Sequence, residues 1–429
     1  MPKIVIASDS FKGSLSSAEV AESIAVGLES VRKDCKVLKI SVADGGEGTV
    51  DALSDSLGGR SVSCKVHDPL MREIEAVYTI LADGRTAVIE MASASGLTLL
   101  SAAERNPMKT STFGTGEMIA DALSKACDRF LVGIGGSATN DGGMGVFSAL
   151  GYRFLDRDGR QLPPCGESLA KVAGIDSSSL NPRLQEAVFT VACDVDTPFC
   201  GREGAAYIFA PQKGASSEEV EILDSGLENF ASVISASLGR DISSVPGSGA
   251  AGGLGGAFLA FSDSRLKKGI DMVLDAIDFD SLIEGADAVI TGEGRIDSQT
   301  FKGKTPFGVM CRARSKGISV YAIGGCAELD GVSGISRLGS DGESLGPNGE
   351  RPGSDGENTG SDGGHFSSDG EHLSSDGGYD CYYGRGFDCI VPAVSGEYDS
   401  ELAMRKDIAE RNVAAAAAFL AKEILGNPQ

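Results

Sequence analysis

Residues 3–31 read KIVIASDSFKGSLSSAEVAESIAVGLESV, an apolar run followed by a polar turn and then an amphipathic segment. The run Lys3–Ala7 is short and apolar, which is typical of a buried strand. Ser16 and Glu19 match a capping box, and apolar residues then recur at helical spacing. The stretch therefore predicts a strand, a turn and a helix in close succession.

Apolar runs and helical patterns alternate along the rest of the chain. Further helices are expected at Thr49–Leu57, from Thr305 to about Ser315 and from about Ser400 to Ile424. Further strands are expected at Val37–Val42, Ala87–Met91, Phe130–Ile134, Phe189–Cys193, Ala288–Thr291, Ile318–Ile323 and Phe387–Val391. Alternation of this kind predicts an α/β fold with mostly parallel sheets.

Length and charge narrow the classes of protein to consider. The chain has 429 residues, a length typical of two or three domains, and a net charge of −23. An acidic chain is repelled by phosphate backbones and anionic lipid, so we expect neither a nucleic acid nor a membrane as partner. Its 10 cysteines form no CxxC pair, and the first residues lack the long apolar segment of a leader. We therefore expect a soluble cytoplasmic protein.

One segment, Ser340–Cys381, has a different composition and repeats every seven residues. It carries ten acidic residues and one basic residue, and it holds two of the chain's three histidines. Such a segment buries too little apolar surface to offset the entropy lost on ordering. Its spacing matches neither a coiled-coil heptad nor a calcium-binding loop. We interpret this acidic array as a flexible insertion.

Five turns after expected strands are rich in Gly, Ser, Thr and acidic residues. They are Ser8–Ser14, Ala43–Thr49, Gly135–Gly143, Cys193–Asp196 and Thr291–Asp297. In open α/β sheets such turns lie at the carboxyl ends of strands, where ligands bind. Glycine lets the backbone approach an anion, and N–H groups at the next helix start point toward it. Any one turn could be a simple connection, but five of matching composition favour a shared anion site.

These turns suit phosphoryl transfer. The reaction needs donors around the phosphates, a divalent cation, a positive charge for the moving phosphoryl group and a carboxylate beside the attacking hydroxyl. The candidate cations are Lys12, Lys213 and Arg295, and the candidate carboxylates are Asp44, Asp141, Asp194 and Asp297. Each could instead be a surface charge or a helix cap. Arg295 is the strongest cation candidate, because a guanidinium can bind a substrate carboxylate through two hydrogen bonds.

Two shorter motifs point to other nucleotide sites. Gly133–Ala138 fits a relaxed dinucleotide fingerprint, but Asn140–Gly143 would fray the helix that the fingerprint requires. Lys302–Thr305 resembles the end of a Walker A loop, but position 298 is Ser where the leading glycine belongs. A flavin or nicotinamide protein thus remains an alternative, and so does an acidic interaction module that works through its array.

Six motifs stand in order along the chain: Ala7–Ser14, Ala43–Thr49, Ile134–Gly143, Pro211–Gly214, Gly249–Gly255 and Thr291–Asp297. Through them the sequence resembles the bacterial-type glycerate kinases of the first class, over nearly the whole chain outside the array. The resemblance implies phosphorylation of D-glycerate with ATP and Mg²⁺. It also implies a flavodoxin-like three-layer domain from both chain ends (1–65 and 286–429) and an inserted second α/β domain (66–285).

The resemblance and the turn residues together suggest a role for each candidate. Gly135, Gly136, Ser137, Thr139 and Asn140 are expected to bind the ATP phosphates, and Asp141 the metal. Catalysis is assigned to Lys12, Asp194 and Arg295. Glycerate is expected to contact Asp44, Gly45, Gly46 and Arg295. We favour 2-phosphoglycerate as product, while the 3-hydroxyl, another small hydroxy acid and a homo-oligomer stay open.

The array can be tested by removing it. Deleting residues 340–381 is expected to keep kinase activity within about twofold of the full chain, because closure entropy varies only slowly with loop length. The measurement is ADP release by both purified chains. Loss of activity in a chain that still folds would favour the interaction module.

Overall fold

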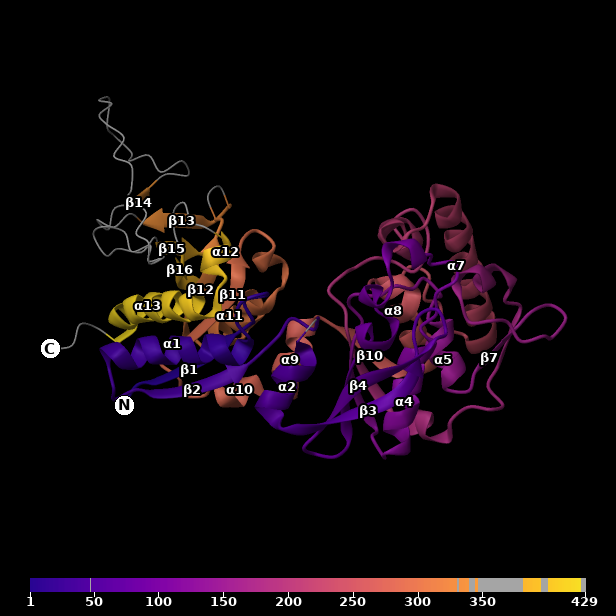
Figure 1. Cartoon of the computed structure of the whole chain (residues 1–429), viewed down its shortest axis with the longest axis horizontal. Coiled ribbons are helices and arrows are strands. Elements are labelled where there is room, and N and C mark those ends of the chain that lie inside the picture. Colours follow the sequence, from indigo (N-terminus) through magenta and orange to yellow (C-terminus); the bar gives the residue numbers. More distant parts are fainter. Residues whose placement is uncertain (47, 330–331, 339–343, 346–380, 395–399, 426–429) are drawn as a thin grey trace, which may run out of the picture. The chain divides into compact units, whose positions relative to one another are not determined.

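The computed structural model describes residues 1–46, 48–329, 332–338, 344–345, 381–394 and 400–425 (Figure 1). They form two compact units, one of Met1–Asp44 with Leu274–Gln429 and the other of Gly45–Val273. The domain boundaries expected from the sequence, 65/66 and 285/286, lie further along the chain. Both units are α/β, which confirms the predicted fold class. The acidic array lies outside the described residues, apart from Ser344, Leu345 and Cys381.

The sheet of the first unit is built around β1. Its strands are β1 Lys3–Ser8, β2 Lys36–Ser41, β11 Ala288–Ile296, β12 Ser319–Ala327, β13 Ile335–Leu338, β14 Ser344–Leu345, β15 Cys381–Gly384 and β16 Phe387–Pro392. Five of them are parallel in the order β2-β1-β11-β12-β16, which is the 2-1-3-4-5 order of flavodoxin-like folds. The chain adds β2 on one side of β1 and then adds β11 on the other side, so the order of strand addition reverses at β1. Folds of this type bind ligands at that switch point.

Helices cover both faces of this sheet. They are α1 Ser17–Val31, α10 Phe279–Leu282, η6 Thr300–Lys302, α11 Thr305–Ser315, α12 Ser400–Ala403 and α13 Lys406–Leu425. α1 and α13 lie side by side (Figure 1) and share one apolar cluster with Ile4 and Ile6 of β1. Val5 is equally buried but points to the opposite face, because side chains alternate along a strand, and α11 packs on that side. The unit thus has three layers drawn from both chain ends.

Two expected elements differ from the structure. The turn predicted at Thr291–Asp297 is wrong, since β11 continues to Ile296 beside β12. Glycines permit this close pairing: a Cβ on Gly325 would lie 2.5 Å from the Gly294 carbonyl oxygen. The single closing helix is also wrong, because α12 ends at Ala403 and α13 begins at Lys406. The Lys406 ammonium, at the start of α13, forms an ion pair with Glu19 of α1.

The second unit contains a six-stranded sheet in the order β10-β9-β6-β5-β4-β3. Its strands are β3 Gly59–His67, β4 Glu73–Leu81, β5 Thr86–Glu90, β6 Arg129–Gly133, β9 Val188–Ala192 and β10 Asp263–Lys267, and a separate ribbon joins β7 Arg153–Leu155 to β8 Gly174–Asp176. β10, β9, β6 and β5 are parallel, whereas β4 and β3 add an antiparallel edge. The strands expected from the sequence did not include this edge.

Helices of the second unit connect and cover these strands. They are α2 Thr49–Leu57, α3 Ala92–Ser95, α4 Phe113–Ser124, α5 Met144–Ala149, α6 Ala205–Phe209, α7 Ser217–Leu238, α8 Ala250–Phe261 and α9 Gly269–Ala276. The short 3-10 turns are η1 Leu97–Leu99, η2 Ala102–Glu104, η3 Gly166–Lys171, η4 Pro182–Glu186 and η5 Pro211–Lys213. Across the described parts of both units, no helix is long and apolar enough to span a bilayer.

The contact between α1 and α13 can be tested at Gly27. A Cβ there would lie 2.2 Å from the Ala414 carbonyl oxygen and 2.7 Å from the Ala417 Cβ. Gly27→Val is therefore expected to lower the free energy of unfolding by about 1–3 kcal/mol, through overpacking. Ala18→Val, at an exposed position of the same helix, should cost no more than about 0.7 kcal/mol. Urea denaturation followed by circular dichroism measures both, and equal losses would contradict the proposed close contact.

Candidate active site

A cavity of about 450 Å³ lies at the switch point of the first unit's sheet. Its walls come from the loop after β1, the carboxyl-terminal parts of β11 and β12, and residues of α12 and α13. Six charged residues line it: Lys12, Arg295, Lys304, Asp9, Asp44 and Glu293. Cations beside carboxylates suit a small ligand that carries both an anionic group and hydroxyls.

Lys12 lies on a tight loop between β1 and α1. Phe11 and Leu15 exchange backbone hydrogen bonds of 2.8 and 3.0 Å, and both side chains are buried. Gly13, at φ +80°, supplies the left-handed residue that the turn needs. The buried pair thus holds the loop closed and leaves Lys12 exposed in the cavity wall.

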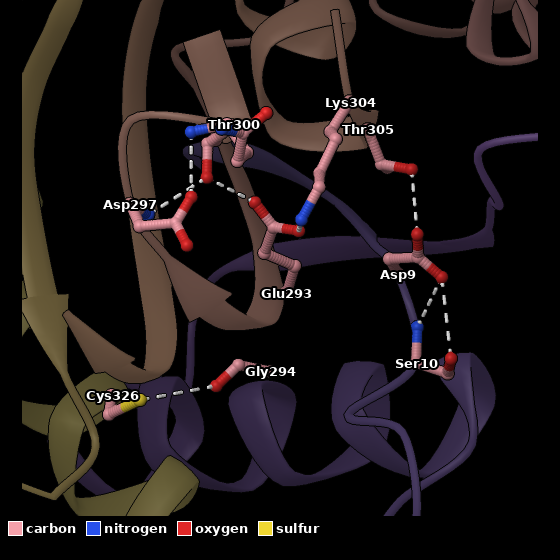
Figure 2. Close-up of polar contacts among 10 residues, drawn as sticks. Asp9, Ser10, Glu293, Gly294, Asp297, Thr300, Lys304, Thr305 and Cys326 are labelled. Carbon is pink, nitrogen blue, oxygen red and sulfur yellow. Dashed lines mark hydrogen bonds and ion pairs between the residues drawn. The ribbon is translucent and has the colours of Figure 1, made fainter. Parts of the chain in front are cut away.

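Asp9 follows β1 directly and is only 7% exposed. Its Oδ2 accepts a hydrogen bond of 2.8 Å from Thr305 Oγ1, the first residue of α11, and its Oδ1 accepts one of 2.7 Å from the Ser10 backbone N–H (Figure 2). Burial, reinforced by the nearby charge of Asp44, raises the pKa of Asp9 to about 6. The carboxyl group therefore titrates close to neutral pH.

Glu293 and Arg295 are both on β11, two residues apart. Glu293 is buried, and its carboxylate accepts hydrogen bonds from Thr300 Oγ1 and Lys304 Nζ (Figure 2). Burial also raises the pKa of Glu293. Arg295 is exposed and forms an ion pair of 2.9 Å with Glu328. An exposed pair contributes little stability, so Arg295 can exchange this partner for a ligand anion at small cost.

A second cluster of expected site residues lies in the second unit, at the carboxyl ends of β6 and β9. Gly135 and Gly136 are exposed on the turn after β6, whereas Ser137, Thr139 and Asn140 are buried. A Cβ on Gly135 would come within 4.0 Å of the Gly46 Cα. The glycines expected to bind phosphate and those expected to bind substrate are therefore neighbours within this unit.

Asp194 lies in the same cluster. It is exposed on the loop after β9, where its Oδ1 accepts a hydrogen bond of 3.0 Å from the Gly269 N–H. Gly45, at φ +86°, also contacts Gly269, because a Cβ on Gly45 would lie 2.4 Å from the Gly269 Cα. Gly269 thus connects the loop of Asp194 with that of Gly45.

Asp141 is fully buried, and protein groups donate four hydrogen bonds to its carboxylate. Its carboxylate accepts hydrogen bonds from the Thr112 N–H and hydroxyl and from the N–H groups of Gly143 and Gly145, at 2.8–3.1 Å. Burial raises its pKa although these donors oppose the shift. A metal ion would have to displace these donors, so the residues around Asp141 do not fit a magnesium site. Among the described residues no group of three or more His, Cys, Asp or Glu side chains could hold a metal ion.

Lys213 is buried beneath the loop after β6 and contacts two of its residues. It is 2% exposed, and its ammonium donates to Ser137 Oγ at 2.8 Å and to the Thr139 carbonyl oxygen at 2.6 Å. Burial lowers the pKa of Lys213 to about 7. The buried amide of Asn140 has no hydrogen-bond partner within the described part of the chain. Lys213 therefore contributes to the loop's conformation rather than lining a surface.

The residues predicted from the sequence therefore divide between the two units. Lys12, Asp44 and Arg295 line one cavity in the first unit. Apart from Asp297, which is in the first unit, the remaining candidates are in the second unit, and the convergence of all of them on one crevice stays a prediction. Asp297 does not line the cavity, but accepts a hydrogen bond of 2.7 Å from the Gln299 N–H.

Sequence reasoning missed three residues of the cavity: Asp9, Glu293 and Lys304. Asp9 and Glu293 both lie in turns that had been singled out, and an acid placed directly after an apolar strand was the available signal. Their burial depends on the pairing of β1 with β11, which no local pattern reveals.

The buried amine of Lys213 makes stability depend on pH. Its pKa of about 7 is below that of a lysine in the unfolded chain. Unfolding therefore takes up a proton between about pH 7 and pH 10, and the free energy of unfolding rises with pH there by up to about 1.4 kcal/mol per pH unit. Lys213→Met should lack this rise. Urea denaturation at about pH 7.5 and about pH 9 measures it. Exposed Lys171→Met is the matched control and should keep the slope of the unsubstituted chain, whereas equal slopes in all three would contradict the assignment.

Comparisons with known proteins agree with this architecture. A glycerate kinase from Bacillus subtilis (strain 168) is 49% identical over 328 residues, which cover 76% of this chain and 86% of that protein. A glycerate 2-kinase from Escherichia coli (strain K12) is 46% identical over 323 residues, covering 75% and 85%. A crystal structure assigned to a glycerate kinase 2 of Salmonella typhimurium LT2 superimposes with a TM-score of 0.80 at 38% identity, covering 99% of this chain and 98% of that one.

The model of one protein family matches most of the chain. It is the Glycerate kinase family, and the match runs over residues 4–342, which includes β1, β11 and the loops of the second unit. With relatives above 45% identity along three quarters of the sequence, the assignment does not depend on any single motif. This chain belongs to the glycerate kinase family.

Proposed function

We propose that the chain transfers the γ-phosphoryl group of ATP to a hydroxyl of D-glycerate, with 2-phosphoglycerate as the favoured product. The observation that carries the proposal is the cavity at the β1–β11 switch point, where three cations and three carboxylates line a space of about 450 Å³. Family membership makes ATP the co-substrate. The name of the Escherichia coli relative, a glycerate 2-kinase, supports the choice of hydroxyl.

In this proposal the cavity binds the acid. Arg295 binds the glycerate carboxylate through two parallel hydrogen bonds, releasing Glu328. Asp44, half-buried after β2, accepts a hydrogen bond from a glycerate hydroxyl. Lys12 and Lys304 stabilise the negative charge of the moving phosphoryl group. Electrostatic stabilisation of this kind, with positioning, makes up most of the catalysis in phosphoryl transfer.

The loop after β6 binds the nucleotide in this proposal. Gly135 and Gly136 are exposed, so that backbone N–H groups are accessible to the phosphates of ATP. Ser137, Thr139 and Asn140 complete the loop, and Gly45, Gly46 and Asp194 lie in the same unit. Mg²⁺ would supply positive charge to the phosphates of the co-substrate, and Asp141 holds the loop in shape.

We infer that the enzyme works in the cytoplasm, where ATP is available. Cys127 and Cys165 are buried thiols rather than disulfides, in keeping with a reducing compartment.

The substrate assignment is tested by coupled ADP release with D-glycerate, L-glycerate, glycolate and lactate, followed by ³¹P NMR of the product. D-glycerate is expected to give the highest kcat/KM, and the phosphorus resonance should couple to the single proton on C2. A doublet of triplets or triplet from the C3 methylene would instead identify the 3-hydroxyl. A higher kcat/KM for another acid would refute glycerate as the substrate but would still support a kinase of small hydroxy acids.

Arg295 provides the sharpest single test of the carboxylate site. Arg295→Met removes a charge-assisted hydrogen bond of about 1.5–3 kcal/mol, so kcat/KM for glycerate is expected to fall about 10- to 150-fold. The KM for ATP should change little. Lys316→Met removes a positive charge from an exposed position of the same unit outside the cavity and serves as control. Equal effects of the two substitutions would contradict the role of Arg295.

A further inference from the structure

Asp9 is a buried acid in the cavity wall, and its hydrogen bonds to the protein do not use all of its acceptor sites. Asp9 immediately follows β1 at the switch point, and it lines the cavity although it is only 7% exposed. The Thr305 hydroxyl donates to one of its oxygens, and the Ser10 N–H and hydroxyl donate to the other at 2.7 and 3.4 Å. A carboxylate has about four acceptor sites, so these three bonds orient the group and leave it able to accept a further proton donor.

The groups that face Asp9 come from every neighbouring element. Asp44 follows β2, Glu293 lies on β11, Lys12 is on the same loop, and Thr305 begins α11. Burial and Asp44 disfavour the charged form of Asp9, while Thr305, Ser10 and Lys12 favour it. Arg295 and Lys304 also line the cavity. Asp9 thus has a pKa of about 6, which allows it to be deprotonated at neutral pH and yet basic enough to accept a proton.

The other acids are less suited to this task. Glu293 is also buried beside the cavity, but one of its oxygens accepts a hydrogen bond from the Lys304 ammonium, whose charge stabilises the ionised carboxylate and makes it a poorer base. Asp194 is exposed and does not line this cavity. Asp141 is enclosed by four donors. Asp9 is instead a buried acid of the cavity wall whose hydrogen bonds come from uncharged donors, and its carboxylate retains a site for the proton of a substrate hydroxyl.

We propose that Asp9 is the general base of the reaction and accepts the proton of the attacking hydroxyl. The role rests on the proposed function. The glycerate O–H bond breaks as its proton passes to the Asp9 carboxylate, and the oxygen forms a bond to the γ-phosphorus. The bond from the γ-phosphorus to the β–γ bridging oxygen breaks, and its electron pair leaves with ADP. Asp9 then releases the proton to water, with Thr305 acting as a positioning residue.

The first test is the Asp9→Asn variant, whose side chain keeps the size and one acceptor of the original. Its kcat is expected to fall about 10²- to 10⁴-fold, the usual contribution of a general base. The KM for glycerate should change less than about threefold, because binding is left in place. Asp34→Asn, at an exposed position of the same unit, is the matched control and should keep full activity.

The pH profile separates a base from a structural acid. The kcat of the unsubstituted chain should fall as the pH drops through about 6, and the residual activity of Asp9→Asn should lack this limb. Thr305→Val removes a donor that stabilises the charged carboxylate, so it should move the limb to higher pH. ¹³C NMR of carboxyl-labelled aspartate provides a readout without turnover: the resonance absent from Asp9→Asn should titrate near the same pH.

Each outcome has a clear consequence. A folded Asp9→Asn that keeps kcat within about threefold, or keeps the acidic limb, overturns the role of Asp9. Loss of that limb in Asp194→Asn instead assigns the base to Asp194. An unsubstituted chain that phosphorylates no hydroxy acid refutes the proposed function, and the role of Asp9 with it. Activity in the unsubstituted chain with an unaffected Asp9→Asn refutes the base alone.

Discussion

The parallel pairing of β1 with β11 is the interaction on which the first unit depends. It joins Ile4 to Ala288 and continues to Ser8 beside Gly292, although the two strands are separated by the whole second unit in sequence. The end of the pairing leaves little room, since a Cβ on Gly292 would lie 2.3 Å from the Ile323 carbonyl oxygen. The Asp9 N–H then donates to the Gly292 carbonyl oxygen at 2.9 Å. This backbone contact sets Asp9 and Glu293 at the same edge of the sheet.

The molecule uses buried charge in two different ways. In the second unit the Asp141 carboxylate accepts four hydrogen bonds and the Lys213 side chain donates two. Both groups therefore stabilise the conformation of the loop after β6. In the first unit Asp9 is oriented but not enclosed, and the cavity gives it access to a ligand. A buried charged group whose hydrogen-bonding capacity is filled by protein partners has a structural role, because it cannot change partners. A buried charged group that keeps hydrogen-bonding capacity beside a cavity is a candidate for a catalytic role.

Several predictions from the sequence could be made because the evidence was local. Lys3–Ala7 is apolar over its whole length, and the capping box at Ser16 appears in the structure with both of its hydrogen bonds. The errors occurred where pairing overrode local preference. The glycines of Thr291–Asp297 indicated a turn, yet they permit β11 to continue beside β12. Asp141 was expected to bind the metal because it lies in a glycine-rich turn, and only the tertiary structure shows that four protein groups donate to its carboxylate.

The amino-acid sequence alone determined the α/β class, the family and the glycine-rich segments that carry Lys12, Asp44 and Arg295. Periodicity, capping and long motifs are properties of neighbouring residues, so they can be recognised before folding is considered. The tertiary structure decided which of these charges are buried and which share a cavity. Burial and the distance between charges depend on strand order and register, and the pairing of β1 with β11 brings together residues nearly 290 positions apart. Asp9 became a candidate base only at that level, because its pKa is set by burial and by the charge of Asp44 from another strand end.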